Sequence, residues 1–434
     1  MSQRLNILIL FYILTAVYLQ NSTKKTLVLL DNWIDVDTHG SFWNQLRKQG
    51  FEAVFKLANE ENLQFSSYGE YLYDNIIFMA SSYDEISRRN KVNIENMLKF
   101  IDDGHDIMIF ADKDSGKFLR NLVNEFGVDF DDYDSQVKDS LHLYDLKDIL
   151  HPDLIKSENE NIIATKNIIN IKNIFTSPSS PILFEGLGMD LDPQSKYVFP
   201  ILRADSSAYS INSQTGEVYS NGERIKLVVG YQARNNRRVI ISGSKEICSD
   251  KLYYFSNDNQ KFCEELLMWN FQKTGVIKFD NIKHNRNDGV SLDTYRIKDF
   301  IEYYVDIYEY DNKNNMWKNY VTDDMQLSFE MMNPYYINKM SRLSNDKPTY
   351  FVKFRAPDKH GVFKFIIDYH RTGYSYIISS TKVPLRPYYH NEYERFLPCA
   401  YPYYTAVFML LLGFVVFSLF FLYGKDKPID ILNK

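Results

Sequence analysis

The feature that most constrains this chain is an uncharged apolar segment close to its C-terminus. Residues 405–423 include 19 side chains and no charge. At a rise of about 1.5 Å per residue, a helix of this length spans roughly 28 Å, close to the hydrocarbon thickness of a bilayer. Tyrosines stand at both ends, where amphipathic rings prefer the headgroup region. Because every side is apolar, the segment predicts a transmembrane helix over 404–423 rather than a buried helix, which would keep a polar stripe.

The N-terminus carries a second membrane-related pattern. A short basic start (1–4) precedes an apolar core, LNILILFYILTAVYL, and a polar stretch follows it. This is the layout of a secretory signal peptide, here predicted over 1–22, although an uncleaved anchor stays open. The two segments together predict a type I topology, with the body in the secretory lumen and the tail 424–434 in the cytosol. Lysines in that tail agree with the positive-inside rule. The glycosylation sequon at Asn21 touches the edge of the signal peptide.

The body between these segments is too long for one core, so we expect two or three domains. The net charge of −6 on 434 residues argues against nucleic acid as a partner. Three cysteines allow at most one disulfide, and Cys248 with Cys263 is the predicted pair.

The first third alternates short apolar strands with helical segments. Strand patterns fall at 27–30, 51–56, 75–80 and 106–111, and helical spacing falls at 38–48, 92–103 and 117–126. This alternation predicts an α/β domain with a parallel sheet and helices on both faces, resembling flavodoxins or glutamine amidotransferases.

The rest of the body changes character twice. A mixed middle region has two strand-like runs around Asn235 and Asn236, then a helix near Trp269. From about 276 to 386 the pattern is β, which predicts a membrane-proximal antiparallel β-sandwich. The predicted units are a signal peptide (1–22), an α/β domain (24–134), a mixed middle domain completing or extending it (135–275), a β-sandwich (276–390), a transmembrane helix (404–423) and a cytosolic tail (424–434).

Polar residues follow several predicted strands, where ligands bind in open parallel sheets. They are Asp31, Asn32, Asp35, Asp37, His39, Ser81, Ser82, Asp112 and Asp114. Such a set could hold a divalent cation, but aspartate and serine after strands also form turns and helix caps. Phosphate-binding glycine loops and a GxSxG elbow are missing from the sequence, and Ser81 and Ser82 stand where an amidotransferase needs cysteine. We therefore predict no catalytic residue, cofactor or metal.

The stretch GYQARNNRRVIISGS gathers Arg234, Arg237 and Arg238 around a turn. The cluster is our predicted contact surface, for an anionic sugar phosphate or an acidic partner. The alternative is a salt-bridged hairpin edge.

The same stretch resembles the hallmark of the DDOST family, the single-pass 48-kilodalton-type subunits of the oligosaccharyltransferase complex. TLVLLDN, YGEYLYDNIIF, SSPILFEGLGM, GVFKFIIDYHRTGY and YERFLPCAYPYY also match, in order. The segments 249–262 and 139–175 depart from the pattern, which leaves contacts with particular partners open.

The resemblance implies a non-catalytic assembly subunit in the endoplasmic reticulum membrane. Its complex transfers an oligosaccharide from a dolichyl-diphosphate donor to Asn in Asn-x-Ser/Thr. The implied partners are the catalytic subunit, ribophorin-type subunits and a small multi-pass subunit. Ala406, Gly413 and Ser418 are small enough to let neighbouring membrane helices approach. The alternatives are a luminal hydrolase acting alone and a cell-surface adhesion protein.

Overall fold

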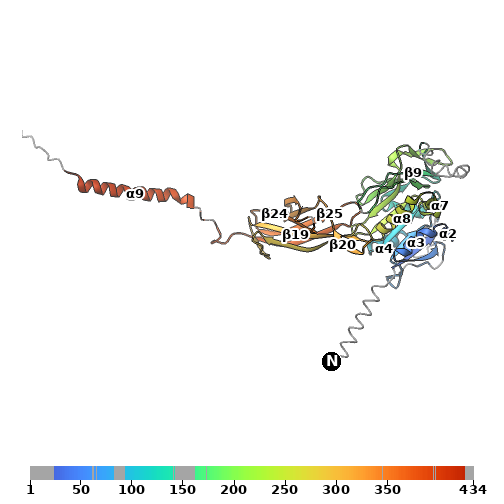
Figure 1. Cartoon of the computed structure of the whole chain (residues 1–434), viewed down its shortest axis with the longest axis horizontal. Coiled ribbons are helices and arrows are strands. Elements are labelled where there is room, and N and C mark those ends of the chain that lie inside the picture. The colour runs from blue at the N-terminus through green and yellow to red at the C-terminus, as the bar shows by residue number, and fades with distance from the viewer. Residues whose placement is uncertain are drawn as a thin grey trace, which may run out of the picture.

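The computed structural model describes residues 24–60, 63–64, 66–82, 93–139, 141, 162–172, 174–344, 346–393, 395 and 397–425. The predicted signal peptide, the Asn21 sequon and residues 426–434 of the predicted tail lie outside the described residues. Figure 1 shows an α/β part, an elongated β part beside it, and the helix α9 beyond the β part.

A nine-stranded mixed sheet organises the α/β part, with strand order β2-β1-β5-β6-β16-β15-β11-β7 and β12 also paired to β15. The parallel strands are β1 (Lys24–Leu30), β2 (Phe51–Leu57), β5 (Asn75–Phe78), β6 (Asp106–Phe110) and β16 (Arg238–Ser242). The antiparallel strands are β7 (Val128–Phe130), β11 (Met189–Leu191), β12 (Val198–Arg203) and β15 (Lys226–Gln232).

Helices cover both faces of this sheet, which is why its central strands read as continuous apolar runs. One face buries Val28 and Ile240 with side chains of α3 (Gly40–Lys48) and α8 (Asn257–Asn270). The other face buries Leu27 and Ile76 with α4 (Ile94–Asp102) and α5 (Lys117–Asn124). The prediction of an α/β N-terminal region with helices on both faces is therefore confirmed, but the sheet is mixed rather than wholly parallel.

The predicted units 24–134 and 135–275 contribute strands to this one sheet. Strand β16, from the middle region, pairs in parallel with β6, from the first third. The remaining elements among the described residues of the α/β part are short. They are α2 (Ile34–Thr38), α7 (Asp250–Phe255), β3 (Ser66–Ser67), β4 (Glu70–Tyr71), β8 (Ser135–Asp139), β9 (Ile163–Thr165), β10 (Ile182–Phe184), β13 (Ala208–Asn212), β14 (Val218–Asn221), η1 (Gly222–Arg224) and η2 (Glu246–Cys248).

Two five-stranded sheets pack against each other in the β part. One contains β17 (Ile277–Arg286), β19 (Phe300–Asp311), β20 (Met316–Asn319), β23 (Ser341–Arg342) and β24 (Thr349–Arg355). The other contains β18 (Tyr295–Arg296), β21 (Gln326–Glu330), β22 (Pro334–Lys339), β25 (Gly361–Tyr369) and β26 (Ile377–Arg386). Rings from the two sheets meet between them, with centroids 5.0 Å apart for Tyr303 and Phe365 and 5.1 Å apart for Phe329 and Phe354.

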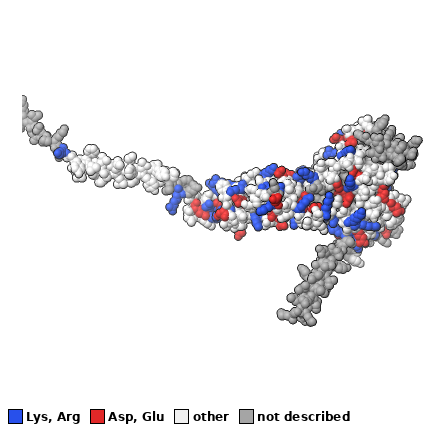
Figure 2. All heavy atoms as spheres, viewed as in Figure 1, with Lys and Arg blue, Asp and Glu red and all other residues white. Residues whose placement is uncertain are grey.

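The helix α9 (Leu397–Tyr423) contains the predicted membrane segment. Within it, Pro398–Tyr423 is the one stretch of the described chain that is long and apolar enough to cross a membrane, with a mean hydropathy of 2.6. Figure 2 shows both signs of charge mixed over the body and a pale, uncharged surface along α9. Its side chains are almost all exposed, because no described part of the chain packs over them.

Candidate functional site

The polar residues after the parallel strands do gather at one edge of the sheet, as the topology requires. Asp31, after β1, accepts hydrogen bonds from the Ser81 hydroxyl at 3.3 Å and the Ser82 backbone N–H at 3.1 Å, both after β5. Asp37, Asn32 and Asp114 are exposed. Asp31 therefore connects the ends of two strands through one of its carboxylate oxygens, Oδ2.

Lys245, which sequence reasoning missed, supplies the cation at this edge. It follows β16, and its ammonium lies 3.3 Å from Asp112 Oδ2 and 3.8 Å from Asp35 Oδ1. Burial acts to lower the pKa of Lys245, but the charges of Asp112 and Asp35 outweigh it and raise that pKa. Among the described side chains, no group of three His, Cys, Asp or Glu is arranged to hold a metal ion.

His39 is buried and engaged at both ring nitrogens. Nε2 lies 3.0 Å from the Lys245 carbonyl oxygen, and Nδ1 lies 3.0 Å from the Asp35 carbonyl oxygen and 2.9 Å from Thr38 Oγ1. These contacts hold α2 and α3 against the segment after β16. The ring has no accessible nitrogen for proton transfer to a substrate in this arrangement.

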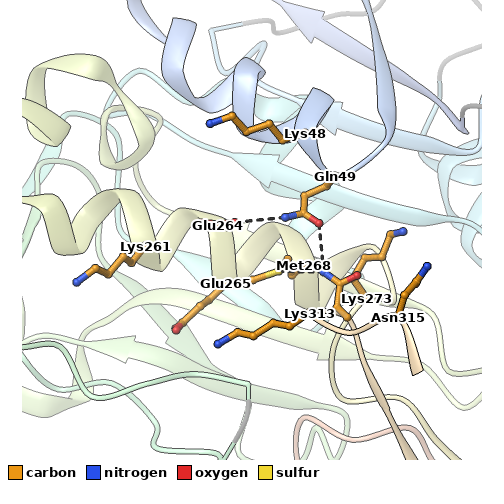
Figure 3. Close-up of a pocket in the computed structure, with 10 residues that line it drawn as sticks. Lys48, Gln49, Lys261, Glu264, Glu265, Met268, Lys273, Lys313 and Asn315 are labelled. Carbon is orange, nitrogen blue, oxygen red and sulfur yellow. Dashed lines mark hydrogen bonds between the residues drawn. The ribbon is translucent and has the colours of Figure 1, made fainter. Parts of the chain in front are cut away.

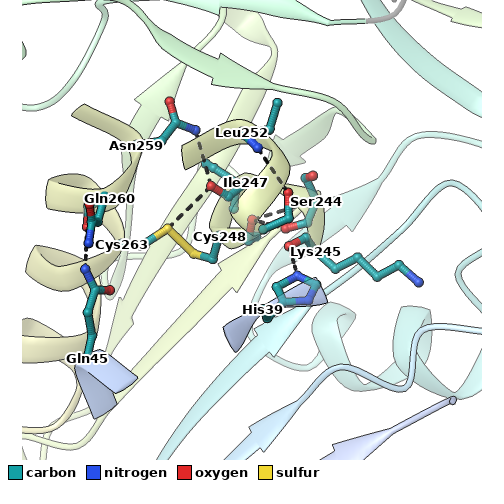
Figure 4. Close-up of a disulfide and its surroundings, with 12 residues drawn as sticks. His39, Gln45, Ser244, Lys245, Ile247, Cys248, Leu252, Asn259, Gln260 and Cys263 are labelled. Atoms are coloured by element: carbon teal, nitrogen blue, oxygen red, sulfur yellow. Dashed lines mark hydrogen bonds between the residues drawn. A yellow bond between two sulfur atoms is a disulfide. The ribbon is translucent and has the colours of Figure 1, made fainter. Parts of the chain in front are cut away.

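The disulfide between Cys248 and Cys263 anchors that same segment to α8 (Figure 4). Beside it, the Asn259 side-chain amide donates to the carbonyl oxygens of Leu183 at 2.8 Å and Ile247 at 3.2 Å. The remaining cysteine, Cys399, is exposed near the start of α9. The disulfide thus fixes η2, which directly follows Lys245, to the helix α8.

The predicted arginine surface needs correction at Arg238. Arg234 is exposed and the Arg237 side chain is 35% exposed, but Arg238 is fully buried at the start of β16. The sequence predicted all three clustered arginines to be exposed, because charged side chains normally lie at the surface. In the structure the Arg238 side chain instead points into the protein. Arg238 therefore cannot form part of a partner-binding surface.

The Arg238 guanidinium instead donates hydrogen bonds to several backbone carbonyl groups. It donates to the carbonyl oxygens of Trp269 at 2.6 Å, Thr274 at 2.7 Å and Gly275 at 2.9 Å, with Gly373 at 3.5 Å. It also lies 4.9 Å from the centroid of the Trp269 ring, whose N–H donates to the Gly373 carbonyl at 2.8 Å. Burial lowers the pKa of Arg238 to about 9, which leaves it charged near neutral pH.

These carbonyl groups belong to both parts of the body. Trp269 lies in the last turn of α8 in the α/β part, and Gly373 lies in the loop between β25 and β26 of the sandwich. Gly275 and Gly373 have positive φ angles of 68° and 83°, and a Cβ on Gly275 would lie 2.5 Å from the Gly373 oxygen. A Cβ on Gly373 would likewise lie 2.7 Å from Ile171 Cδ1, so both glycines permit the close approach of the α/β part and the sandwich at this joint.

Further hydrogen bonds from the hairpin β15–β16 reach the same sandwich loop. The Gln232 side chain donates to the Tyr374 carbonyl at 2.8 Å. The Asn236 side chain donates to the Tyr376 carbonyl at 2.8 Å and accepts from the Tyr376 N–H at 2.5 Å. The motifs GYQARNNRRVIISGS and GVFKFIIDYHRTGY therefore meet at the interdomain joint, with Arg238 at its centre.

The three small residues proposed for the membrane interface do not share one helix face. Ala406 and Gly413 are seven positions apart and lie about 20° from each other around the axis, whereas Ser418 lies about 140° from Gly413. The Ser418 hydroxyl donates to the Phe414 carbonyl of its own helix at 2.8 Å. Ala406 and Gly413 are the pair that a neighbouring helix could approach together.

An α/β part and a β-sandwich meet at a buried arginine, and the helix α9 that follows is long and apolar enough to cross a membrane. These features define a class of multidomain proteins with a candidate membrane anchor near the C-terminus. Two family models match the chain: the OST48 N-terminal domain over residues 17–273 and the OST48 middle domain over residues 282–425. The chain belongs to the OST48 family, which confirms the resemblance drawn from its motifs.

Several curated relatives carry the name dolichyl-diphosphooligosaccharide–protein glycosyltransferase 48 kDa subunit. The Arabidopsis thaliana protein is 36% identical over 93% of both chains, and the Danio rerio protein is 34% identical over 96% of both. The Drosophila melanogaster protein is 34% identical over 93% of this chain and 92% of its own. A solved structure of Agd3, a carbohydrate deacetylase, aligns with 63% of this chain and about a third (35%) of its own, with 10% identity and a TM-score of 0.30. We draw nothing from a likeness at that level.

Proposed function

We propose that this protein is a non-catalytic assembly subunit of an oligosaccharyltransferase in the endoplasmic reticulum membrane. The complex would transfer a dolichyl-diphosphate-linked oligosaccharide to Asn of Asn-x-Ser/Thr in nascent proteins. The observation that carries this proposal is the identity of 34–36% along nearly the whole chain with relatives named as the 48 kDa subunit of that glycosyltransferase.

The non-catalytic part of the proposal rests on the edge of the parallel sheet. Lys245 occupies the position between Asp35 and Asp112 that a cation or substrate group would need, and both nitrogens of His39 have partners. Groups that neutralise one another stabilise the fold, and neither Lys245 nor His39 is then free to act as a base or nucleophile toward a substrate. This argues against the alternative of a hydrolase acting alone.

The proposed topology is type I, with 24–390 in the lumen, α9 in the bilayer and a short cytosolic tail. We propose units at 24–275 and 276–390, joined at Arg238, in place of three luminal domains. The proposed partners are the catalytic subunit, ribophorin-type subunits and a small multi-pass subunit. The order β2-β1-β5-β6-β16 of the parallel strands supports the finer proposal of a flavodoxin-like doubly wound sheet.

A mild-detergent purification of the tagged full-length chain, with mass spectrometry of the co-purifying proteins, tests the proposal. We expect the catalytic oligosaccharyltransferase subunit and at least one accessory subunit. A matched chain in which α9 is replaced by an unrelated transmembrane helix controls for detergent carry-over. Purification of the full-length chain without these subunits would contradict the proposal. Delivery of the protein to the cell surface would favour the adhesion alternative.

A further inference from the structure

A groove of about 580 Å³ lies where α3 and α8 of the α/β part face the β19–β20 turn of the sandwich (Figure 3). Its floor crosses the boundary between the two parts. The Asn312 side chain donates to the Gln49 side-chain oxygen at 3.2 Å, and the Gln49 amide donates to Glu264 at 3.3 Å. The groove is distinct from the sheet edge and from the Arg238 joint.

Four lysines surround this groove, and their charge is only partly compensated. Lys261 pairs with Asp258 at 3.1 Å. Lys48, Lys273 and Lys313 form no ion pair within 4.0 Å with any carboxylate of the described residues. Burial, with a smaller contribution from the charge of Lys24 outside the groove, lowers the pKa of Lys273.

The two carboxylates of the groove have other partners. Glu264 accepts from Gln49, and Glu265 accepts from the Thr176 hydroxyl at 2.6 Å and the Thr176 N–H at 3.1 Å. Glu265 interacts with Lys313 only at longer range. Hydrogen bonds from these neutral groups leave both carboxylates charged, but the lining has four lysines and two glutamates, so it keeps a local excess of positive charge. The whole chain has a net charge of −6, so attraction of an anion here is a property of the site and not of the whole molecule.

We propose that this groove binds an acidic segment of another polypeptide. Lysines supplied by α3, by the segment after α8 and by the β19–β20 turn lie around one opening, as Figure 3 shows, so successive carboxylates of one extended chain could meet them in turn. The groove is open at the surface and contains the apolar Met268, which suits a peptide lying across it. This inference requires only the charge and shape of the groove and goes beyond the proposed function.

The test uses the purified full-length protein in detergent and a fluorescein-labelled (Glu-Gly)6 peptide, with (Gln-Gly)6 as the uncharged probe. The groove variant combines Lys48→Gln, Lys273→Gln and Lys313→Gln. The control variant changes three exposed lysines of the sandwich, Lys339→Gln, Lys347→Gln and Lys382→Gln. Fluorescence anisotropy should show binding of the acidic probe alone, weakened about tenfold in the groove variant and less than about twofold in the control.

Equal binding of the two probes, or equal binding by the two variants, would overturn the proposal. Failure of the wild-type protein to bind (Glu-Gly)6 while it binds labelled tripolyphosphate would also overturn it, because the occupant would then be a phosphate group. Lys273 is half-buried, so the pair Lys48→Gln and Lys313→Gln, both exposed, serves if the triple variant does not fold. That pair should weaken binding of the acidic probe several-fold, and unchanged binding would contradict the proposal.

Discussion

Replacing Arg238 with methionine should loosen the joint between the α/β part and the sandwich. Methionine keeps an unbranched apolar stem of similar length but has no donor for the surrounding carbonyl groups. The oxygens of Trp269, Thr274 and Gly275 would each lose a hydrogen bond of 2.9 Å or less. Water cannot replace these bonds readily, because the site is fully buried.

The expected loss follows from two opposing contributions. Hydrogen bonds from a charged donor contribute about 1.5–3 kcal/mol each, so three give about 5–9 kcal/mol. Several kcal/mol are regained because a guanidinium no longer has to be taken out of water. Removal of one side of a buried charged network typically leaves a net loss of about 3–5 kcal/mol in the free energy of unfolding, and we expect that range here.

Arg237→Met provides the matched control, since it removes the neighbouring arginine. Its guanidinium lies 3.7 Å from Asp106 and is partly exposed, so we expect a loss of about 0–1 kcal/mol. Urea unfolding of the full-length chain in detergent, followed by tryptophan fluorescence, measures both variants. At a slope of about 3 kcal/mol per molar urea, Arg238→Met should lower the midpoint by roughly 1–2 M.

Equal midpoints for the two variants would refute this reasoning, because exposed and buried arginines would then contribute alike. An unchanged midpoint in Arg238→Met would mean that methionine packing fully replaces the hydrogen bonds. Retention of stability in Arg238→Lys would also contradict it, since one ammonium cannot reach carbonyl groups spread around a planar guanidinium.

Three further predictions concern the disulfide, a buried carboxylate and the anchor. Replacing both cysteines, Cys248→Ser with Cys263→Ser, should lower the free energy of unfolding by about 3 kcal/mol, as expected for a closed loop of about 15 residues. Treating the wild-type protein with a reducing agent should cause an equal loss, and this comparison checks the prediction. Although burial acts to raise the pKa of Asp258, hydrogen bonds from Ser180 and Ser179 hold it below its usual value. The stabilisation that the ionised carboxylate provides is present above about pH 4 and is lost as the pH falls. Asp258→Asn should therefore lower the free energy of unfolding by about 1–2 kcal/mol at pH 7 and by less at pH 3, as measured by thermal unfolding. A cost that grows on acidification would exclude these hydrogen bonds as the cause. Gly413→Leu should reduce co-purification of the complex several-fold, because the larger side chain would keep a neighbouring helix away. The control variant Val415→Leu lies on the opposite face of α9 and should not reduce it. Equal yields from the two variants would exclude the Ala406–Gly413 face as a contact.

The local sequence pattern was sufficient to predict those elements whose burial depends on residues close by in the chain. The uncharged run 405–423 predicted α9, and apolar runs alternating with helical spacing predicted β1, β5, β6, α4 and α5. These elements are specified by side-chain periodicity, which the chain order alone displays. Ordered motifs along the chain also indicated the family, which the comparisons with known proteins confirmed.

The candidate site depended on contacts between residues far apart in the chain. By sequence alone, the acidic residues after β1 and β6 are compatible with a cation site. In the structure Lys245, more than a hundred residues later in the chain, lies between Asp35 and Asp112. The only sequence sign of it was a lysine directly after the ISGS strand. The ion pairs of Lys245 with Asp35 and Asp112 arise from the fold, and the order of residues along the chain does not show them.

The burial of Arg238 is the clearest feature that the sequence alone could not predict. Composition and spacing determined that a membrane anchor, an α/β sheet and a β-rich region had to form, because each buries its own apolar pattern. Whether an arginine faces water or the interior depends on which carbonyl groups the fold brings to it. Only the tertiary structure placed Trp269, Gly275 and Gly373 around Arg238, because the free energy of burying that charge is recovered from partners on two different domains.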